Sequence, residues 1–134
     1  NATVPESASK PATPAAIQVI TEQVAPGVQY LTGGTHHSVA IEMRDHVVVV
    51  EAPQSEARSL AVIAKTKELF PTKRIRYVVN THVHFDHSGG LRAFVDEGAT
   101  VITYWSNRPF FEEAWAAPRT INRNRLLSPG SAYN

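Results

Sequence analysis

Short blocks of apolar residues in the first third of the chain predict β-strands. Two strand-like segments flank a Pro26-Gly27 turn, and residues 38–43 alternate apolar and polar positions before a tight turn at residues 44–46. The next block, residues 47–50, consists of four consecutive valines, a pattern typical of a strand that is buried on both faces. The sequence therefore predicts a β-hairpin that leads into the interior of a sheet.

Helical spacing then alternates with further strands. Ser55 is a suitable N-cap for a helix that Pro71 ends, and Leu60, Ile63 and Ala64 follow at helical spacing on its expected buried side. The remaining predicted elements are a strand at 75–79, a helix at 91–97, a strand at 100–104 and a helix at 108–115. This order predicts an α/β (α+β) fold, with a mixed β-sheet and helices on one face.

Composition divides the chain into two regions. Residues 1–16 are rich in Ala, Pro, Ser and Thr and have no apolar period, which predicts a flexible linker or arm. We expect the folded domain to span residues 17–134. The proline-rich start resembles an interdomain linker, and we expect an exported or periplasmic parent protein in preference to a cytoplasmic one.

Charge and cysteine content exclude several kinds of function. Thirteen Lys and Arg against twelve Asp and Glu give a net charge of +1, so we expect no nucleic-acid partner. We also expect no membrane partner, since no apolar run reaches the roughly 18 residues that a transmembrane helix needs. The absence of cysteine excludes disulfides, thiolate metal sites and cysteine nucleophiles.

Metal-ligand side chains are concentrated directly after the strand at 75–79, where His82, His84, Asp86 and His87 fall within six residues. Catalytic zinc sites use imidazole and carboxylate ligands and leave one position for water. In an extended segment, His82 and His84 project on the same side and suit one ion, while Asp86 and His87 suit a second. Four such residues between a strand and a helix favour a metal site over a solvated loop. We predict up to two Zn²⁺ ions, with iron or manganese left open.

The H-x-H-x-D-H pattern of residues 82–87 resembles the signature of the metallo-β-lactamase superfamily, and residues 19–127 are similar to the amino-terminal half of that fold. The resemblance implies half of an αβ/βα sandwich. It also implies a zinc-dependent hydrolase, in which metal-activated water attacks an ester, lactam, thioester or related bond of a small-molecule substrate. His82 and His84 would hold the first metal, and Asp86 and His87 the second. Asp86 would also orient the attacking hydroxide.

Three further residues are candidates beside the metal ligands. By the same resemblance, Glu51, at the end of a buried strand, would orient a metal ligand, and a solvated surface carboxylate is an equally good interpretation. His36 and His37 follow Gly33-Gly34 in a loop between early strands. Contact with substrate is one role for this pair, and simple solvent exposure is the commoner one.

The ligand set of the resembled family is incomplete in this sequence. A complete site also uses a third histidine, a bridging aspartate and a last histidine from the second half of the fold. No histidine follows His87, and the only later aspartate, Asp96, lies in the helix after the motif. We therefore expect an amino-terminal half with a partial metal site, inactive on its own.

A half-fold would leave one face of its sheet uncovered, and we expect this face to contain Val39, Ile41, Val48, Val50 and Val78. The partner would be either the missing carboxy-terminal half or a second copy of the chain, which gives a homodimer. The alternative function is a non-catalytic metal-binding or assembly module that dimerises through this sheet.

Overall fold

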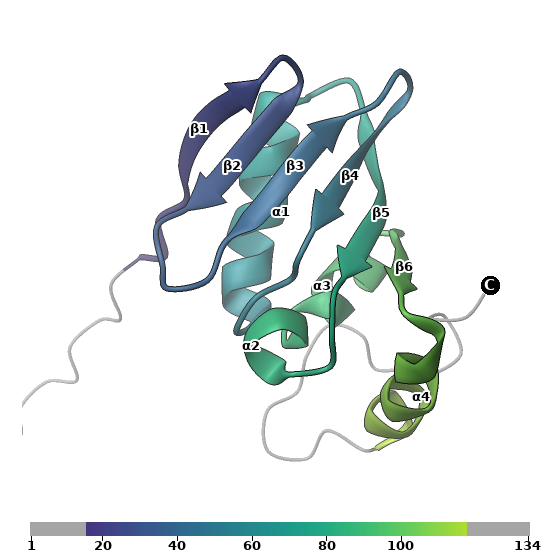
Figure 1. The fold of residues 1–134 in the computed structure, drawn as a ribbon. Coiled ribbons are helices and arrows are strands. Elements are labelled where there is room, and N and C mark those ends of the chain that lie inside the picture. The colour runs from purple at the N-terminus through teal and green to yellow at the C-terminus, as the bar shows by residue number, and fades with distance from the viewer. Residues whose placement is uncertain (1–15, 118–134) are drawn as a thin grey trace, which may run out of the picture.

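The computed structural model describes residues 16–117, which form one six-stranded sheet with its strands in sequence order (Figure 1). The strands are β1 (Ile20–Ala25), β2 (Val28–Thr32), β3 (Ser38–Glu42), β4 (His46–Val50), β5 (Arg74–Asn80) and β6 (Thr100–Thr103). Neighbours from β1 to β4 are antiparallel, whereas β4, β5 and β6 are parallel. The predicted mixed sheet is confirmed.

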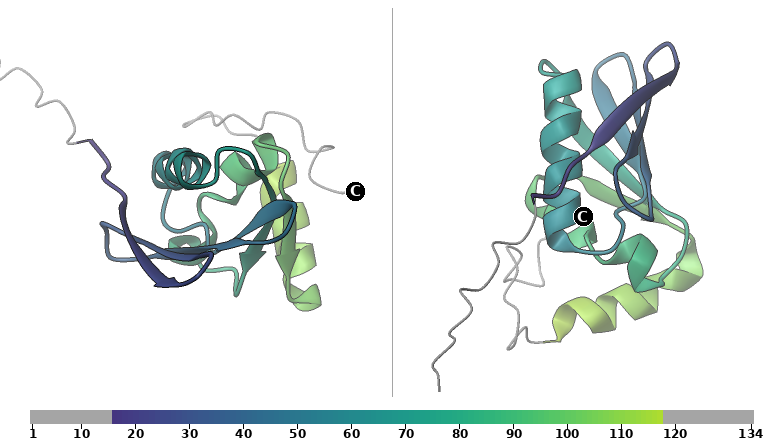
Figure 2. Two further views of the ribbon diagram at one scale, coloured as in Figure 1. Left: turned by 90° about the horizontal axis from the view of Figure 1, so that it is seen from above. Right: turned by 90° about the vertical axis from the view of Figure 1, so that its left-hand side faces the viewer.

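Helices occupy the connections between the parallel strands and the segment after β6. They are α1 (Glu56–Leu69), α2 (Phe85–Ser88), α3 (Leu91–Asp96), the 3₁₀ helix η1 (Trp105–Asn107) and α4 (Arg108–Ala116). Figure 2 shows α1 and α3 together on one side of the sheet, where they pack against each other. As predicted, the Ser55 side chain caps α1 by accepting a hydrogen bond from the Arg58 backbone N–H. The four-residue α2 is not predicted from the sequence, because one turn is too short to show a period.

The two faces of the sheet differ in burial. Val47 and Val49 of β4 are fully buried beneath the helices, whereas Val48 and Val50 are only half-buried on the opposite face. The prediction that β4 is buried on both faces is therefore wrong. Val78, expected on the uncovered face, is also fully buried. The wrong assignment arises because a run of valines contains no alternation from which the two faces could be told apart.

The buried side of α1 also differs from the prediction. Ala64 is exposed and Leu60 is only half-buried. The buried residues are Arg58, Ser59, Val62, Ile63 and Thr66. Arg58 is buried because its guanidinium donates hydrogen bonds to the backbone carbonyls of Gln18 (2.7 Å) and Thr32 (2.9 Å). Burial lowers the pKa of Arg58 below its ordinary value.

The predicted linker and the end of the predicted domain, residues 118–134, lie outside the described residues, apart from Ala16 at the start. The division into linker and domain therefore stays a prediction. Within residues 16–117, no helix has the length and apolar character needed to cross a membrane.

Candidate metal centre

The histidine-rich segment follows β5 and is held against the segment that follows β4. The backbone N–H groups of Ala52 and Gln54 donate to the carbonyls of His87 (3.3 Å) and Asp86 (3.2 Å). In return, the N–H of Gly90 donates to the carbonyl of Ala52 (3.0 Å). These bonds join residues 51–54 to α2, so two segments at the carboxyl ends of neighbouring parallel strands form one unit.

Close packing also holds the motif against α1. A Cβ atom on Gly90 would lie 1.8 Å from Ser59 Oγ and 2.5 Å from Ser59 Cβ. A Cβ atom on Gly89 would lie 2.3 Å from the carbonyl oxygen of Gln54. Neither glycine has a positive φ, so both are needed for close approach and not for backbone conformation.

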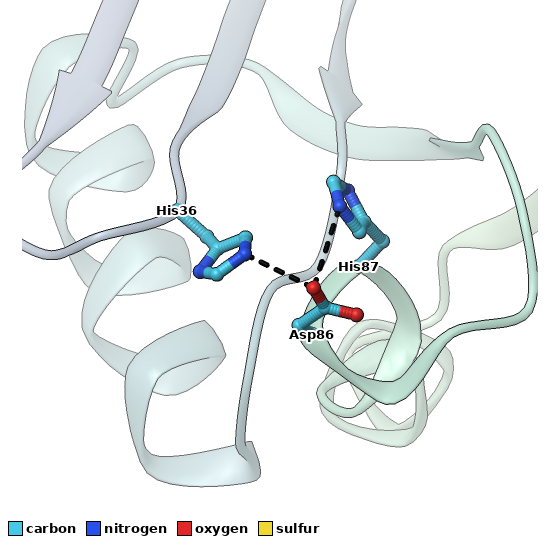
Figure 3. A group of neighbouring side chains, drawn as sticks. All are labelled: His36, Asp86 and His87. Atoms are coloured by element: carbon cyan, nitrogen blue, oxygen red, sulfur yellow. Dashed lines mark ion pairs between the residues drawn. The ribbon is translucent and has the colours of Figure 1, made fainter.

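His36, Asp86 and His87 converge at this point (Figure 3). His36 comes from the loop between β2 and β3, and the other two come from α2. His36 Nε2 lies 3.1 Å from Asp86 Oδ2, and His87 Nε2 lies 3.7 Å from the same oxygen. One ligand atom of each residue lies within 4.8 Å of the others, so this group could hold a metal ion. Two imidazoles and one carboxylate are ligands that suit zinc.

Glu51 supports this group through both of its carboxylate oxygens. Oε1 accepts a hydrogen bond from the Thr81 backbone N–H (2.9 Å), and Oε2 lies 3.0 Å from His87 Nδ1. A carboxylate only accepts hydrogen bonds, so His87 Nδ1 carries a proton, and Nε2 is the ring nitrogen left to coordinate a metal. The Glu51 side chain is only 13% exposed. This geometry does not fit a solvated surface carboxylate; that Glu51 orients a metal ligand stays a prediction.

His82 and His84 lie beside this group, and the His82 ring contacts both His84 and His87. Their ring centroids are 4.9 Å apart, and the His82 and His87 centroids are 4.2 Å apart. Thr81 Oγ1 lies 2.9 Å from His82 Nδ1. Within residues 16–117, the pair is not part of a larger group of close ligand atoms. The division of the four motif residues between two metals stays a prediction.

The Asp86 carboxyl is biased toward its charged form. Partial burial would by itself raise its pKa. The hydrogen bond from its own backbone N–H and the nearby charges of His87 and His36 outweigh that effect, so the pKa lies below its ordinary value. Asp86 is therefore a carboxylate at neutral pH, as a metal ligand must be.

An open cleft of about 340 Å³ borders the group. His36, Glu51 and His87 line the side next to the candidate ligands, and Tyr30 and His37 line it as well. The His37 ring packs on Tyr30 with centroids 5.1 Å apart, and its buried Nδ1 has no hydrogen-bond partner. Both predicted loop histidines thus border one cleft, while their contact with substrate stays a prediction.

Comparison with solved structures shows the class of fold. The chain is similar to a metallo-β-lactamase from Hirschia baltica (25% identity, TM-score 0.62), with 72% of this chain and 48% of that one covered. It is also similar to one from Pseudomonas aeruginosa solved in a mono-zinc form (23%, TM-score 0.61, 71% and 46% covered). A motif mutant of the Cronobacter sakazakii enzyme gives 26% identity and a TM-score of 0.61, with 72% and 38% covered. The fold is that of the metallo-β-lactamases, and the chain spans about half the length of these structures or less.

The family model of the metallo-β-lactamase superfamily matches residues 31–119, which include every candidate ligand. The chain belongs to this superfamily, and the resemblance stated from the histidine motif is confirmed. No curated protein is significantly similar to the chain.

Proposed function

We propose that this chain is part of a zinc-dependent hydrolase. The observation that carries the proposal is the convergence of His36, Asp86 and His87 at one end of the parallel strands, next to an open cleft. Membership of the metallo-β-lactamase superfamily supports the same conclusion. A bound zinc ion makes a nearby water molecule more acidic and polarises the bond to be cleaved.

The chain's own residues contribute position and charge. Asp86 stays ionised between two imidazoles and is the candidate to orient the attacking water. Glu51 holds the proton of His87 on Nδ1, which keeps Nε2 available. The cleft, lined largely by aromatic, imidazole and aliphatic side chains, would receive a small-molecule ester, lactam or thioester substrate.

The full activity needs more than residues 16–117, in our proposal. The chain covers only 48% of the Hirschia baltica structure, and its β3–β5 residues on the face opposite the helices are only half-buried. We propose that a carboxy-terminal half covers this face and supplies further ligands. The second candidate, favoured by the same half-buried face, is a non-catalytic module in which a second copy covers the sheet as a homodimer.

Native mass spectrometry with zinc quantified on the same sample separates these alternatives. A mass near 14.7 kDa, apart from any bound zinc, supports an incomplete half, whereas twice that mass with about one zinc per chain supports a homodimer that completes the site. Hydrolysis is then assayed with a chromogenic lactam, a thioester, a lactone and a phosphodiester. Activity should be abolished by a chelator, restored by Zn²⁺ and lost in Asp86→Asn. The hydrolase proposal fails if neither the chain nor its complemented form cleaves any of them.

A further inference from the structure

His36 lies about fifty residues before the histidine motif, yet its ring faces the Asp86 carboxylate. We propose that His36 is a direct metal ligand, so that His36, Asp86 and His87 form a two-histidine, one-carboxylate metal site within this chain. This inference rests on the proposed metal-dependent function and adds a ligand that is not part of the H-x-H-x-D-H motif.

The distances fit one small ion. Ligand atoms bound to a tetrahedral zinc at about 2.0–2.2 Å are roughly 3.3–3.6 Å apart. His36 Nε2 and His87 Nε2 lie 3.1 Å and 3.7 Å from Asp86 Oδ2, on either side of that spacing. All three ligand atoms fall within 4.8 Å of one another, and binding one ion would draw them in to the tetrahedral spacing.

Each imidazole also presents the correct nitrogen. Thr35 Oγ1 lies 3.0 Å from His36 Nδ1 and accepts a hydrogen bond from Gln54 Nε2 (2.8 Å). With its second lone pair, this hydroxyl can accept from His36 Nδ1. His36 Nε2 is then the nitrogen that faces Asp86 and would bind the ion once it gives up its proton, and Glu51 leaves His87 Nε2 in the same role. Outer oxygen partners of this kind orient histidine ligands in metal sites.

The loop that carries His36 is fixed beside α2. Gln54 bonds to Thr35 through its side chain, and its backbone N–H bonds to the Asp86 carbonyl, so one residue connects both parts of the site. Gly33 has φ 107°, and a Cβ atom there would lie 2.4 Å from the Gln18 carbonyl oxygen. The loop therefore packs closely on the chain before β1, and His36 is held in position before an ion binds.

A site formed by His36, Asp86 and His87 would let an isolated half-fold bind a metal ion. Two histidines and a carboxylate on one side of an ion leave other positions open for water and substrate. The Asp86 and His87 position would then hold an ion without any residue from a second half, whereas the His82 and His84 pair would still need another ligand.

The test measures metal binding by the whole 134-residue chain, using Co²⁺ as the spectroscopic probe and Zn²⁺ in competition. We compare the unchanged chain with His36→Gln, His36→Ala and Asp86→Asn. The control is His46→Gln, since His46 pairs with Asp45 and Tyr77 at the opposite end of β4. Circular dichroism on the same samples checks folding, and the glutamine variant keeps a polar side chain in the loop should the alanine variant fold poorly.

If His36 is a ligand, both His36 variants weaken Co²⁺ binding by roughly tenfold to a hundredfold and change the cobalt absorption bands, and His46→Gln does neither. Unchanged affinity and absorption bands in folded His36→Gln overturn the inference, as does a wild-type chain that binds Co²⁺ no better than Asp86→Asn. Hydrolysis is measured separately. His36-dependent binding without hydrolysis by the chain or its complemented form rejects only the hydrolase proposal, and metal-dependent hydrolysis with unaltered binding in His36→Gln rejects only this ligand.

Discussion

The contact between Gly90 and Ser59 gives a direct test of how the motif is attached to α1. Replacing Gly90 with alanine places a methyl group 2.5 Å from Ser59 Cβ and 2.8 Å from the Ser55 carbonyl oxygen. Ser59 Oγ, at 1.8 Å, has no hydrogen-bond partner and can rotate away, but the other two atoms belong to the first turns of α1. The helix and the motif must therefore separate by roughly 0.6–0.9 Å to restore ordinary contact.

We expect Gly90→Ala to lower the free energy of unfolding by about 3 kcal/mol, the upper end of the cost of overpacking, because the clashing atoms cannot all move by rotation. For a domain of this size that corresponds to a fall in Tm of roughly 12–24 °C. Urea unfolding at one protein concentration, followed by far-ultraviolet circular dichroism, measures the change. Metal affinity measured on the same variant should also fall, since Asp86 and His87 lie on the displaced α2.

A second substitution identifies the cause. Ser59→Gly removes the two nearest atoms and costs about 1 kcal/mol by itself, as a glycine inside a helix. The double variant Ser59→Gly/Gly90→Ala should be at least about 1 kcal/mol more stable than the sum of the two single-variant losses predicts. Gly89→Ala is the matched control, because its methyl group meets the backbone carbonyls of Gln54 and Phe85, so Ser59→Gly should not rescue it. The proposed contact is refuted if Gly90→Ala has the wild-type urea midpoint. It is also refuted if the stability losses of Ser59→Gly and Gly90→Ala add in the double variant.

Three further substitutions test other parts of the structure. Glu51→Gln should weaken Zn²⁺ binding about tenfold to a hundredfold, because the carboxylate that fixes the His87 ring is lost; equal affinity in a competition titration contradicts that role. Arg58→Met should lower the free energy of unfolding by about 2–3 kcal/mol, because two buried hydrogen bonds are lost. Arg108→Ala, at an exposed ion pair, is the control and should change it by less than about 0.5 kcal/mol. Similar urea midpoints for the two variants would contradict a stabilising role of the buried Arg58 hydrogen bonds. Val48→Lys places a charge on the half-buried sheet face and should reduce any self-association seen by sedimentation velocity; an unchanged dimer fraction would show that this face is not the interface.

The strands and the position of the motif could be predicted from the sequence because both depend on neighbouring residues. Alternation in residues 38–43 and the turn at 44–46 identify the β3–β4 hairpin, and ligand-type residues after β5 identify the site. The buried face of α1 could not be predicted in this way. Arg58 and Ser59 are buried because of their tertiary contacts: Arg58 bonds to two distant carbonyls, and Ser59 packs against Gly90.

The contact between His36 and Asp86 depends on tertiary structure to the same degree. The sequence marks His36 only as one of two adjacent histidines after two glycines, which is also the pattern of an exposed loop. The structure separates the pair, since His36 faces Asp86 while His37 packs on Tyr30. A rule that sought histidines near the carboxyl ends of parallel strands would have missed His36, because its loop joins two antiparallel strands.

Residues 51–54 explain how candidate metal ligands from distant segments reach one place. Glu51 and Gln54 have φ values of 69° and 65°, the left-handed region that costs a non-glycine residue roughly 1–2 kcal/mol. Both residues bond to the candidate centre, Glu51 to the His87 ring and Gln54 to the Asp86 backbone and the hydroxyl beside His36. Such conformations persist when surrounding contacts hold them, and the hydrogen bonds of this segment offset the cost. The geometry of the candidate ligands is therefore set by the hydrogen-bonded connection between β4 and α1 as much as by the histidine motif, and all of these connections lie within residues 16–117.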